Sequence, residues 1–172
     1  MDVREQLYEH VPRLRRYARA LVSNRELADD LVQDTLERAL SRLAQFSAGT
    51  DLRAWLFTIM HNLFVNQVRK ASARSRHVSI DDDDFDDADV AIPASQTDSL
   101  EVRDLDFALQ RLPAAQREVV LLVGLEEMSY IDVASALDIP IGTVMSRLSR
   151  GRERLRALMA GTHQDTKLKV VK

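Results

Sequence analysis

A run of arginines between residues 147 and 156 is the stretch whose side chains are best suited to bind a ligand. These residues include five arginines against one glutamate, and the hydroxyl-bearing Ser146 and Ser149 lie beside and among them. Arginine is permanently charged and can bind a phosphate or a guanine edge through two hydrogen bonds. We therefore expect this stretch to contact nucleic acid. The candidate contact residues are Met145, Ser146, Ser149, Arg150 and Arg154.

A helix-turn-helix is the local structure that would position these side chains. Ser129 can cap a first helix over residues 129–137, and Asp138 tolerates the left-handed conformation of a sharp turn. Pro140 cannot continue that helix but can begin a second one. Helical spacing predicts the buried faces to be Ile131, Val133, Ala134 and Leu137, then Val144, Leu148, Gly151, Leu155 and Leu158. The alternative is an αα-hairpin in a bundle, with a solvated arginine face.

A second candidate surface lies on a helix predicted over residues 52–70. One side of this helix carries amides followed by basic residues, and such a strip suits contacts to bases and to backbone phosphates. A solvated helix is the alternative. The candidate residues are Asn62, Asn66, Arg69 and Lys70. In the preceding loop, residues 46–51, Gly49 permits unusual backbone angles, and Thr50 or Asp51 can cap the helix.

A third candidate surface is the acidic side of a helix predicted over residues 25–43. Helical spacing predicts an inward face of Leu27, Leu31, Leu36, Ala39, Leu40 and Leu43. The outward face is then Asp29, Asp30, Gln33, Asp34, Glu37 and Arg38. Periodicity alone does not distinguish such a binding face from ordinary solvated surface.

Composition excludes several classes of protein. The chain has 172 residues and no cysteine, which excludes disulfides and thiolate-zinc sites. The four histidines lack metal-ligand spacing, and no nucleophile–base pair, phosphate loop or carboxylate constellation is visible. We therefore expect neither an enzyme nor a cofactor. The chain start lacks a signal pattern, and no run of about 18 apolar residues occurs. These features predict a cytoplasmic protein without membrane insertion.

Charge divides the chain into three parts. The net charge is −3, but residues 1–76 contain 13 basic against 9 acidic residues. Residues 77–100 contain 8 acidic residues and no basic one, and residues 101–172 contain 11 basic against 10 acidic residues. The block of like charge at residues 81–89 repels itself, which predicts a disordered linker.

All predicted elements are helices. Apolar periodicity predicts further helices over residues 2–22, 100–112 and 114–123, with Pro12 near a helix start or a kink. The predicted architecture is all-α, with two small helical domains. Its parts are an N-terminal bundle over residues 1–72, a flexible acidic linker over 73–99, a helix-turn-helix domain over 100–160 and a disordered tail over 161–172.

Three stretches carry a resemblance to a known family. They are ADDLVQDTLERAL at residues 28–40, FSAGTDLRAWLFTIMHNLFVNQVRK at 46–70, and residues 109–158, which end in SYIDVASALDIPIGTVMSRLSRGRERLRAL. In this order they resemble the polymerase-binding helix, the −10 reader and the −35 domain of extracytoplasmic-function sigma factors. These are the small two-domain members of the sigma-70 family, which serve bacterial RNA polymerase. The helix-turn-helix alone would be a weak signal, whereas the combination is specific.

The resemblance implies a role for each candidate residue. The clamp helices of core RNA polymerase would contact Asp30, Gln33, Asp34 and Glu37. A base flipped from the single-stranded −10 element would be held by Phe46, Ser47 and Gly49 of the loop and by Asn62 and Asn66. Its unstacking costs a few kcal/mol. Arg69 and Lys70 would hold the phosphates of that strand. The double-stranded −35 element would be read by Met145, Ser146, Ser149 and Arg150, although many relatives have Arg in place of Met145.

The implied protein is a transcription initiation factor that binds core RNA polymerase and promoter DNA. It would help melt the −10 region and would be controlled by an anti-sigma protein. One alternative is a sigma-like decoy that sequesters an anti-sigma protein without binding promoters. Such a decoy need not keep the arginines of the two candidate DNA surfaces, Arg69, Arg150, Arg152 and Arg154. Another is a dimeric helix-turn-helix repressor, which would not explain residues 28–70.

Overall fold

Every regular element of the described chain is a helix. The computed structural model describes residues 2–75 and 100–167. The first group comprises α1 (Val3–Val22), α2 (Arg25–Ser41), the short 3-10 helix η1 (Leu43–Gln45) and α3 (Leu52–Ser75). The second comprises α4 (Leu100–Gln110), α5 (Ala114–Gly124), α6 (Tyr130–Leu137) and α7 (Ile141–Lys167). The predicted all-α fold is confirmed; most of the predicted linker and the end of the tail lie outside the described residues.

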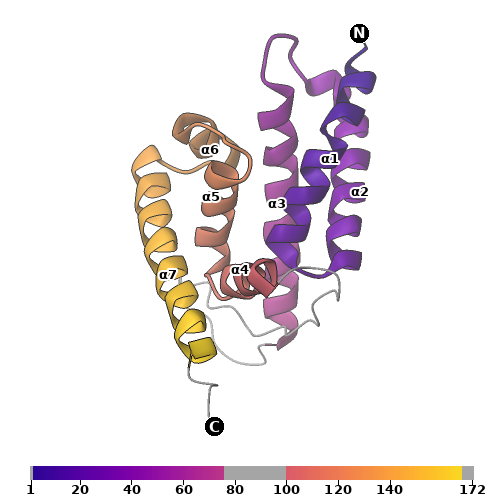
Figure 1. Cartoon of the computed structure of the whole chain (residues 1–172). Coiled ribbons are helices and arrows are strands. Elements are labelled where there is room, and N and C mark those ends of the chain that lie inside the picture. Colours follow the sequence, from indigo (N-terminus) through magenta and orange to yellow (C-terminus); the bar gives the residue numbers. More distant parts are fainter. Residues whose placement is uncertain (1, 76–99, 168–172) are drawn as a thin grey trace.

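The α1–α3 group is an up-and-down bundle (Figure 1). The side chains of Asp2 and Asn24 cap α1 and α2, because they accept the backbone N–H groups of Arg4 and Leu27. Between the two helices, Ser23 has a φ of 59°, a left-handed conformation that ends α1 and lets the chain reverse. The largest fully buried side chains of this bundle are Leu7, Leu14, Leu21, Leu31, Leu56 and Met60.

The burial pattern of α2 differs from the prediction. Leu27 and Leu40, expected to face inward, are 47% and 43% exposed. The buried side of the helix is instead Ala28, Leu31, Val32, Thr35 and Ala39. The hydroxyl of Thr35 donates to the carbonyl of Leu31 at 2.6 Å, so its burial leaves no unpaired donor. Because most of this stripe is small, α2 packs against both α1 and α3 while the two leucines stay in solvent.

Two positions also need comment. Of the two places expected for Pro12, the helix start is excluded, because Pro12 lies well inside α1; it is on the exposed side, where water can hydrate the carbonyl that loses its partner. Ile131, expected in the core of the first helix of the helix-turn-helix, is 70% exposed. The buried side of α6 is Val133, Ala136 and Leu137.

The helix-turn-helix forms where its capping and turn residues predict it. The Ser129 hydroxyl accepts the backbone N–H of Asp132 at 3.1 Å and donates to that residue's carboxylate at 2.7 Å. Asp138 ends α6 in the left-handed region, with a φ of 52°. Pro140 immediately precedes α7, which runs past the expected end at residue 158 to Lys167.

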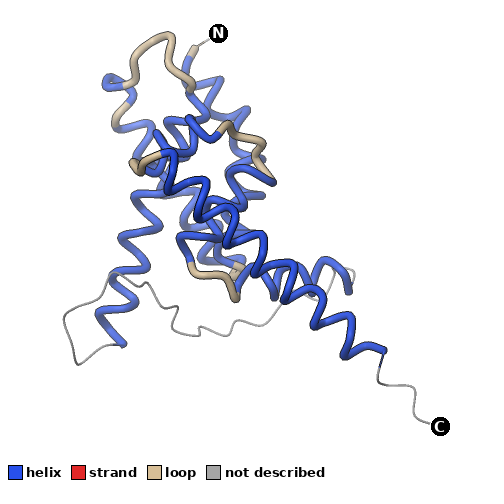
Figure 2. The backbone as a smooth tube through the Cα atoms, turned by 90° about the vertical axis from the view of Figure 1, so that its left-hand side faces the viewer, coloured by secondary structure: helices blue, strands red, loops and turns tan. Residues whose placement is uncertain are grey.

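The two groups of helices contact each other directly. α3 packs against α6, and α1 packs against α4 and α5. Figure 1 shows α5 and α6 between α3 and α7, and Figure 2 shows the same body from the side, with the start of α1 and the end of α7 at opposite ends. None of the described helices is long and apolar enough to cross a lipid bilayer.

Candidate DNA and polymerase interfaces

The candidate −35 residues all lie on the exposed side of α7. Met145 is 53% exposed, and the other four candidates, Ser146, Ser149, Arg150 and Arg154, are exposed as well. On the opposite side Val144 and Leu148 are 0% and 3% exposed and fix the rotation of the helix. The positively charged face therefore points to solvent, as a groove-entering helix requires.

Further side chains extend this face beyond the candidates. A shallow groove between α6 and α7 is lined by Tyr130, Met145, Leu148, Ser149, Arg152, Glu153 and Arg156. Arg152 and Arg156 belong to the arginine run, so the composition of that run pointed to them. Tyr130 was not predicted, because it precedes α7 by a full helix and only the turn at Asp138 brings it near Ser149.

Close packing between α5 and α7 holds the recognition helix in place. Gly151 is buried on the inner side of α7, where a Cβ atom would lie 2.7 Å from Cγ2 of Val120 and 3.5 Å from the carbonyl oxygen of Gln116. A glycine at this position therefore lets the two helix backbones approach closely.

The candidate −10 strip is also exposed. Asn62, Asn66, Arg69 and Lys70 are all exposed on α3. At 100° per residue these four lie within an arc of about 100°, and with a rise of 1.5 Å they extend over about 12 Å of helix. One solvent-facing strip thus carries two amides followed by two cations.

The loop before α3 is held by several internal contacts, although its tip is exposed. The Phe46 ring packs on Trp55 with centroids 5.2 Å apart. The Ser47 carbonyl accepts the Thr50 hydroxyl at 2.7 Å and the Thr50 backbone N–H at 3.1 Å. Gly49 has a φ of +102°, which only glycine adopts without strain. Asp51 accepts the backbone N–H of Arg53 at 2.9 Å and starts α3, as expected for a capping residue.

The acidic side of α2 combines charge with exposed apolar surface. Asp30, Gln33, Asp34 and Glu37 are exposed, and Gln33 donates to Glu37 at 3.2 Å. The exposed Leu27 and Leu40 flank this acidic face on either side, towards the two ends of the helix. Asp29 differs, because it pairs with Arg15 and Arg19 of α1 at 3.9 and 3.7 Å. Singly exposed leucines are common on protein surfaces, so the row of exposed carboxylates is what makes this side of α2 a candidate binding surface.

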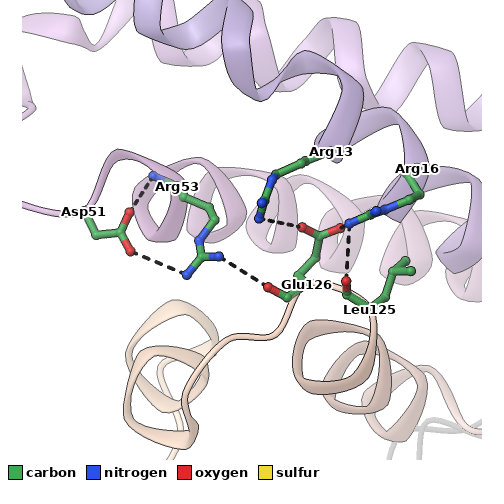
Figure 3. A network of polar contacts seen from close by, with 6 residues as sticks. All are labelled: Arg13, Arg16, Asp51, Arg53, Leu125 and Glu126. Carbon is green, nitrogen blue, oxygen red and sulfur yellow. Dashed lines mark hydrogen bonds and ion pairs between the residues drawn. The ribbon is translucent and has the colours of Figure 1, made fainter.

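A set of polar contacts joins the two groups of helices, and the sequence did not predict it. Glu126, between α5 and α6, is 1% exposed and accepts Arg16 of α1 at 3.0 Å; Arg13 lies 3.8 Å away (Figure 3). Arg53 of α3 donates to the Glu126 carbonyl at 3.3 Å. Further along α3, Nδ1 of His61 lies 2.7 Å from the carboxylate of Glu118.

A buried tyrosine lies beside these carboxylates. Tyr17 of α1 is 2% exposed and packs edge-to-face on Phe57 of α3, with ring centroids 5.0 Å apart. Burial, followed by the nearby charges of Glu118 and Glu126, raises the pKa of the Tyr17 phenol well above its ordinary value. Within residues 2–75 and 100–167 no cluster of three or more potential metal ligands occurs.

Both groups of helices match known protein families. Residues 7–61 match the family model described as the Sigma2 domain of PhyR, and residues 103–155 match sigma-70, region 4. The ECF RNA polymerase sigma factor EcfG of Rhodopseudomonas palustris is 41% identical over 158 residues, which cover 92% of this chain and 85% of that protein. The chain is a member of the extracytoplasmic-function sigma factors. It therefore directs RNA polymerase to promoters and is not an enzyme.

Other sigma factors support the same placement. The RNA polymerase sigma factor CarQ of Myxococcus xanthus is 33% identical, with 92% of this chain and 90% of that protein covered. Among solved structures, the sigma factor RpoE of Bartonella quintana, crystallised with the anti-sigma factor NepR, has a TM-score of 0.76 and 40% identity over 92% of this chain and 97% of that chain. CnrH, in complex with the cytosolic domain of CnrY, has a TM-score of 0.66 and 26% identity over 91% and 86% of the two chains. Both likenesses extend over the two groups of helices.

Proposed function

We propose that this sigma factor reads two promoter elements through the two exposed strips described above. The α7 face would enter the major groove of the double-stranded −35 element, with Ser146, Ser149 and Arg150 at base edges and Arg154 at phosphate. Met145 offers only apolar contact, which suits a thymine methyl group better than guanine. The observation that supports this role best is the solvent-facing arginine side of α7, held in position by buried Val144 and Leu148.

The α3 strip would bind the −10 element as a single strand. Asn62 and Asn66 can pair with the exposed edge of an unstacked base, and Arg69 and Lys70 can neutralise phosphates. The loop containing Phe46, Ser47 and Gly49 is held against α3 through the Phe46–Trp55 contact. A rigid loop of this kind reduces the ordering entropy of capturing a flipped base, and that capture would assist melting.

Core RNA polymerase would dock on the acidic side of α2. Asp30, Gln33, Asp34 and Glu37 suit a basic partner surface, while Leu27 and Leu40 add apolar area at the two ends of the face. In contrast, Asp29 is paired with Arg15 and Arg19 inside the chain and is a poorer candidate for an intermolecular contact.

An anti-sigma protein would hold this factor inactive in the cytoplasm. The similar Bartonella quintana sigma factor was crystallised with NepR, and its structure matches both groups of helices with a TM-score of 0.76. We take an anti-sigma protein of that class as the partner of this chain. It would bind across both groups and prevent them from separating.

A run-off transcription assay tests the proposed function. Core RNA polymerase, this protein and a template with matched −35 and −10 elements should give a defined transcript that is lost without the protein. A decoy would give no transcript but would still bind an anti-sigma protein. That alternative rests on the match of residues 7–61 to a domain of PhyR, which is called an anti-anti-sigma factor in its structure with NepR. Binding to an anti-sigma protein without any promoter-dependent transcript would favour the decoy.

A further inference from the structure

The closed arrangement of the two groups of helices cannot serve promoter recognition as it stands. The −10 and −35 elements lie, by their names, about 25 base pairs apart, or about 85 Å at about 3.4 Å per base pair. A compact chain of 172 residues has a radius of gyration of about 16 Å, so the whole body is far shorter than that separation. The α1–α3 and α4–α7 groups must therefore separate before α3 and α7 can occupy both elements.

Several polar contacts join the two groups, including those of His61, Gln110 and Arg117, and one cluster among them is built so that water can replace it. We name it the Glu126 cluster; it consists of Glu126, the Leu125 carbonyl, Arg13, Arg16 and Arg53 (Figure 3). Arg16 donates both to the Glu126 carboxylate at 3.0 Å and to the Leu125 carbonyl at 3.2 Å. The arginine side chains of Arg13 and Arg16 are 49% and 53% exposed, whereas the Glu126 side chain is 0% exposed. The cluster thus covers a buried anion with cations that water can reach.

The buried carboxylate is only partly satisfied. Its Oε1 atom accepts a hydrogen bond from Arg16, but its Oε2 atom has no hydrogen-bond partner and Arg13 is 3.8 Å away. A buried charge with one unpaired oxygen retains much of its desolvation cost. The unpaired oxygen lowers the stability of the closed form relative to an open form in which Glu126 is hydrated.

We infer that the Glu126 cluster is an autoinhibitory contact, which keeps the free sigma factor closed until core polymerase and DNA bind the separated groups. This inference rests on the proposed function. Core polymerase would favour the open form by binding it more tightly than the closed form. The affinity measured for the free protein is then reduced by the fraction that is already open.

Removing the two cations of the cluster tests its closing role. The chain has no native cysteine, so Ser41→Cys on α2 and Ala157→Cys on α7, both exposed positions, accept a donor and an acceptor dye without competing sites. The double variant Arg13→Ala/Arg16→Ala should lower energy transfer, because the ratio of closed to open molecules should fall at least about tenfold when charged hydrogen bonds are lost. The matched control is Arg15→Ala/Arg19→Ala, which removes the same charge from the same helix and, within residues 2–75 and 100–167, breaks ion pairs to Asp29 of α2 alone.

A second pair of variants distinguishes opening of the molecule from loss of folding. Arg16→Glu puts a like charge beside Glu126 and should open the molecule, with far-UV circular dichroism unchanged. Adding Glu126→Gln to Arg16→Glu removes the repulsion and should restore energy transfer. Equal transfer in Arg13→Ala/Arg16→Ala and in its control, or no recovery in the Arg16→Glu/Glu126→Gln protein, would overturn the closing role.

Transcription at limiting sigma factor tests the inhibitory role. Arg13→Ala/Arg16→Ala should give several-fold more run-off transcript than wild type and control, with the excess disappearing at saturating protein. Reduced energy transfer with unchanged transcription would mean that the contact closes the molecule without inhibiting it, which would overturn the inference. If no variant and not even the wild type gave a promoter-dependent transcript, the proposed function would fail, whereas the dye measurement would still report whether the cluster closes the chain.

Discussion

Arg150 is the residue on which the −35 proposal depends most directly. It is exposed on α7, one turn beyond Ser146 and on the side opposite buried Val144 and Leu148. If its guanidinium holds a guanine edge, Arg150→Ala should cost about 1–3 kcal/mol and relax preference at one base pair. Binding measured on a set of −35 variants at two salt concentrations will show this loss as sequence-dependent.

The same assay separates base contact from phosphate contact. Arg154 lies one further turn along α7, and Arg154→Ala should weaken binding about equally on all sequences and reduce the salt slope by about one. If Arg150→Ala also weakened binding equally on all sequences, Arg150 would contact phosphate and not a base. No loss for either variant would show that this side of α7 does not face DNA.

Tyr17 should make the protein sensitive to alkaline pH. Burial raises its pKa in the folded state above the ordinary value of about 10. The folded state therefore holds the proton more tightly than the unfolded state, so this contribution to stability is complete below about pH 10 and is lost as pH rises through the folded-state pKa. Tyr17→Phe keeps the aromatic contact to Phe57 and should make the decline in unfolding free energy above pH 10 shallower. It should also remove the last phenolate step in absorbance, and an unchanged alkaline titration would contradict the prediction.

At the scale of single elements, α2 offers a direct test of polymerase docking. Asp34→Arg should weaken binding to core RNA polymerase at least about tenfold, because it opposes a basic partner surface with a like charge. The fold should persist, since Asp34 is exposed. Fluorescence titration with core enzyme measures the affinity, and Glu9→Arg on α1 makes the same charge change at an exposed position outside the candidate face. Equal affinities for the two variants would remove α2 from the interface.

Packing of α5 on α7 should depend on Gly151. Gly151→Ala places a Cβ atom 2.7 Å from Cγ2 of Val120, which forces the two helices apart or shifts the valine. Overpacking of this kind costs about 1–3 kcal/mol. Denaturant unfolding should show that loss, and Val120→Ala in the same chain should recover part of it. A loss that Val120→Ala does not reduce would mean that backbone or solvent effects cause it.

The same elements show what the sequence determines locally. The sequence predicts the helix boundaries because caps and breakers are local signals: Ser129 accepts the Asp132 N–H, and Asp138 ends α6 in the left-handed region. Leu27, Leu40 and Ile131 were misplaced because α2 and α6 each allow more than one apolar stripe at helical spacing. Which stripe is buried depends on neighbouring helices. On α2 the buried stripe is the one rich in small residues, which lets α2 lie close to α1 and α3, and Leu27 and Leu40 remain exposed.

At the scale of the whole molecule, sequence periodicity does not predict the contacts between the two groups of helices. Glu126 and Arg16 are separated by 110 residues, and neither belongs to a motif. The C-terminal end of α1 shows the same dependence. Its carbonyls at Ala20 and Leu21 accept Gln110 and Arg117 of the other group at 2.9 and 3.0 Å. Helix ends need such partners, and here a distant segment supplies them.

Each group should still fold without the other, but less stably. The α1–α3 group has its own core, including Leu14, Leu31 and Leu56, so a fragment of residues 1–75 should unfold cooperatively by circular dichroism. It loses the two hydrogen bonds at the end of α1, and hydrogen bonds from a charged donor such as Arg117 are worth about 1.5–3 kcal/mol. Its midpoint temperature should therefore lie below that of the intact chain.

Arg117→Lys in the intact chain is the matched variant for that comparison. Lysine cannot reproduce the planar set of donors that Arg117 gives to the carbonyls of Leu21, Leu109, Gln110 and Leu112. The stability of the α1–α3 group inside this variant, followed by hydrogen exchange at α1, should approach that of the isolated fragment. A fragment without a cooperative transition would show that the α1–α3 group folds only against its partner. An open sigma factor made of two folded groups would then be unavailable to either promoter element.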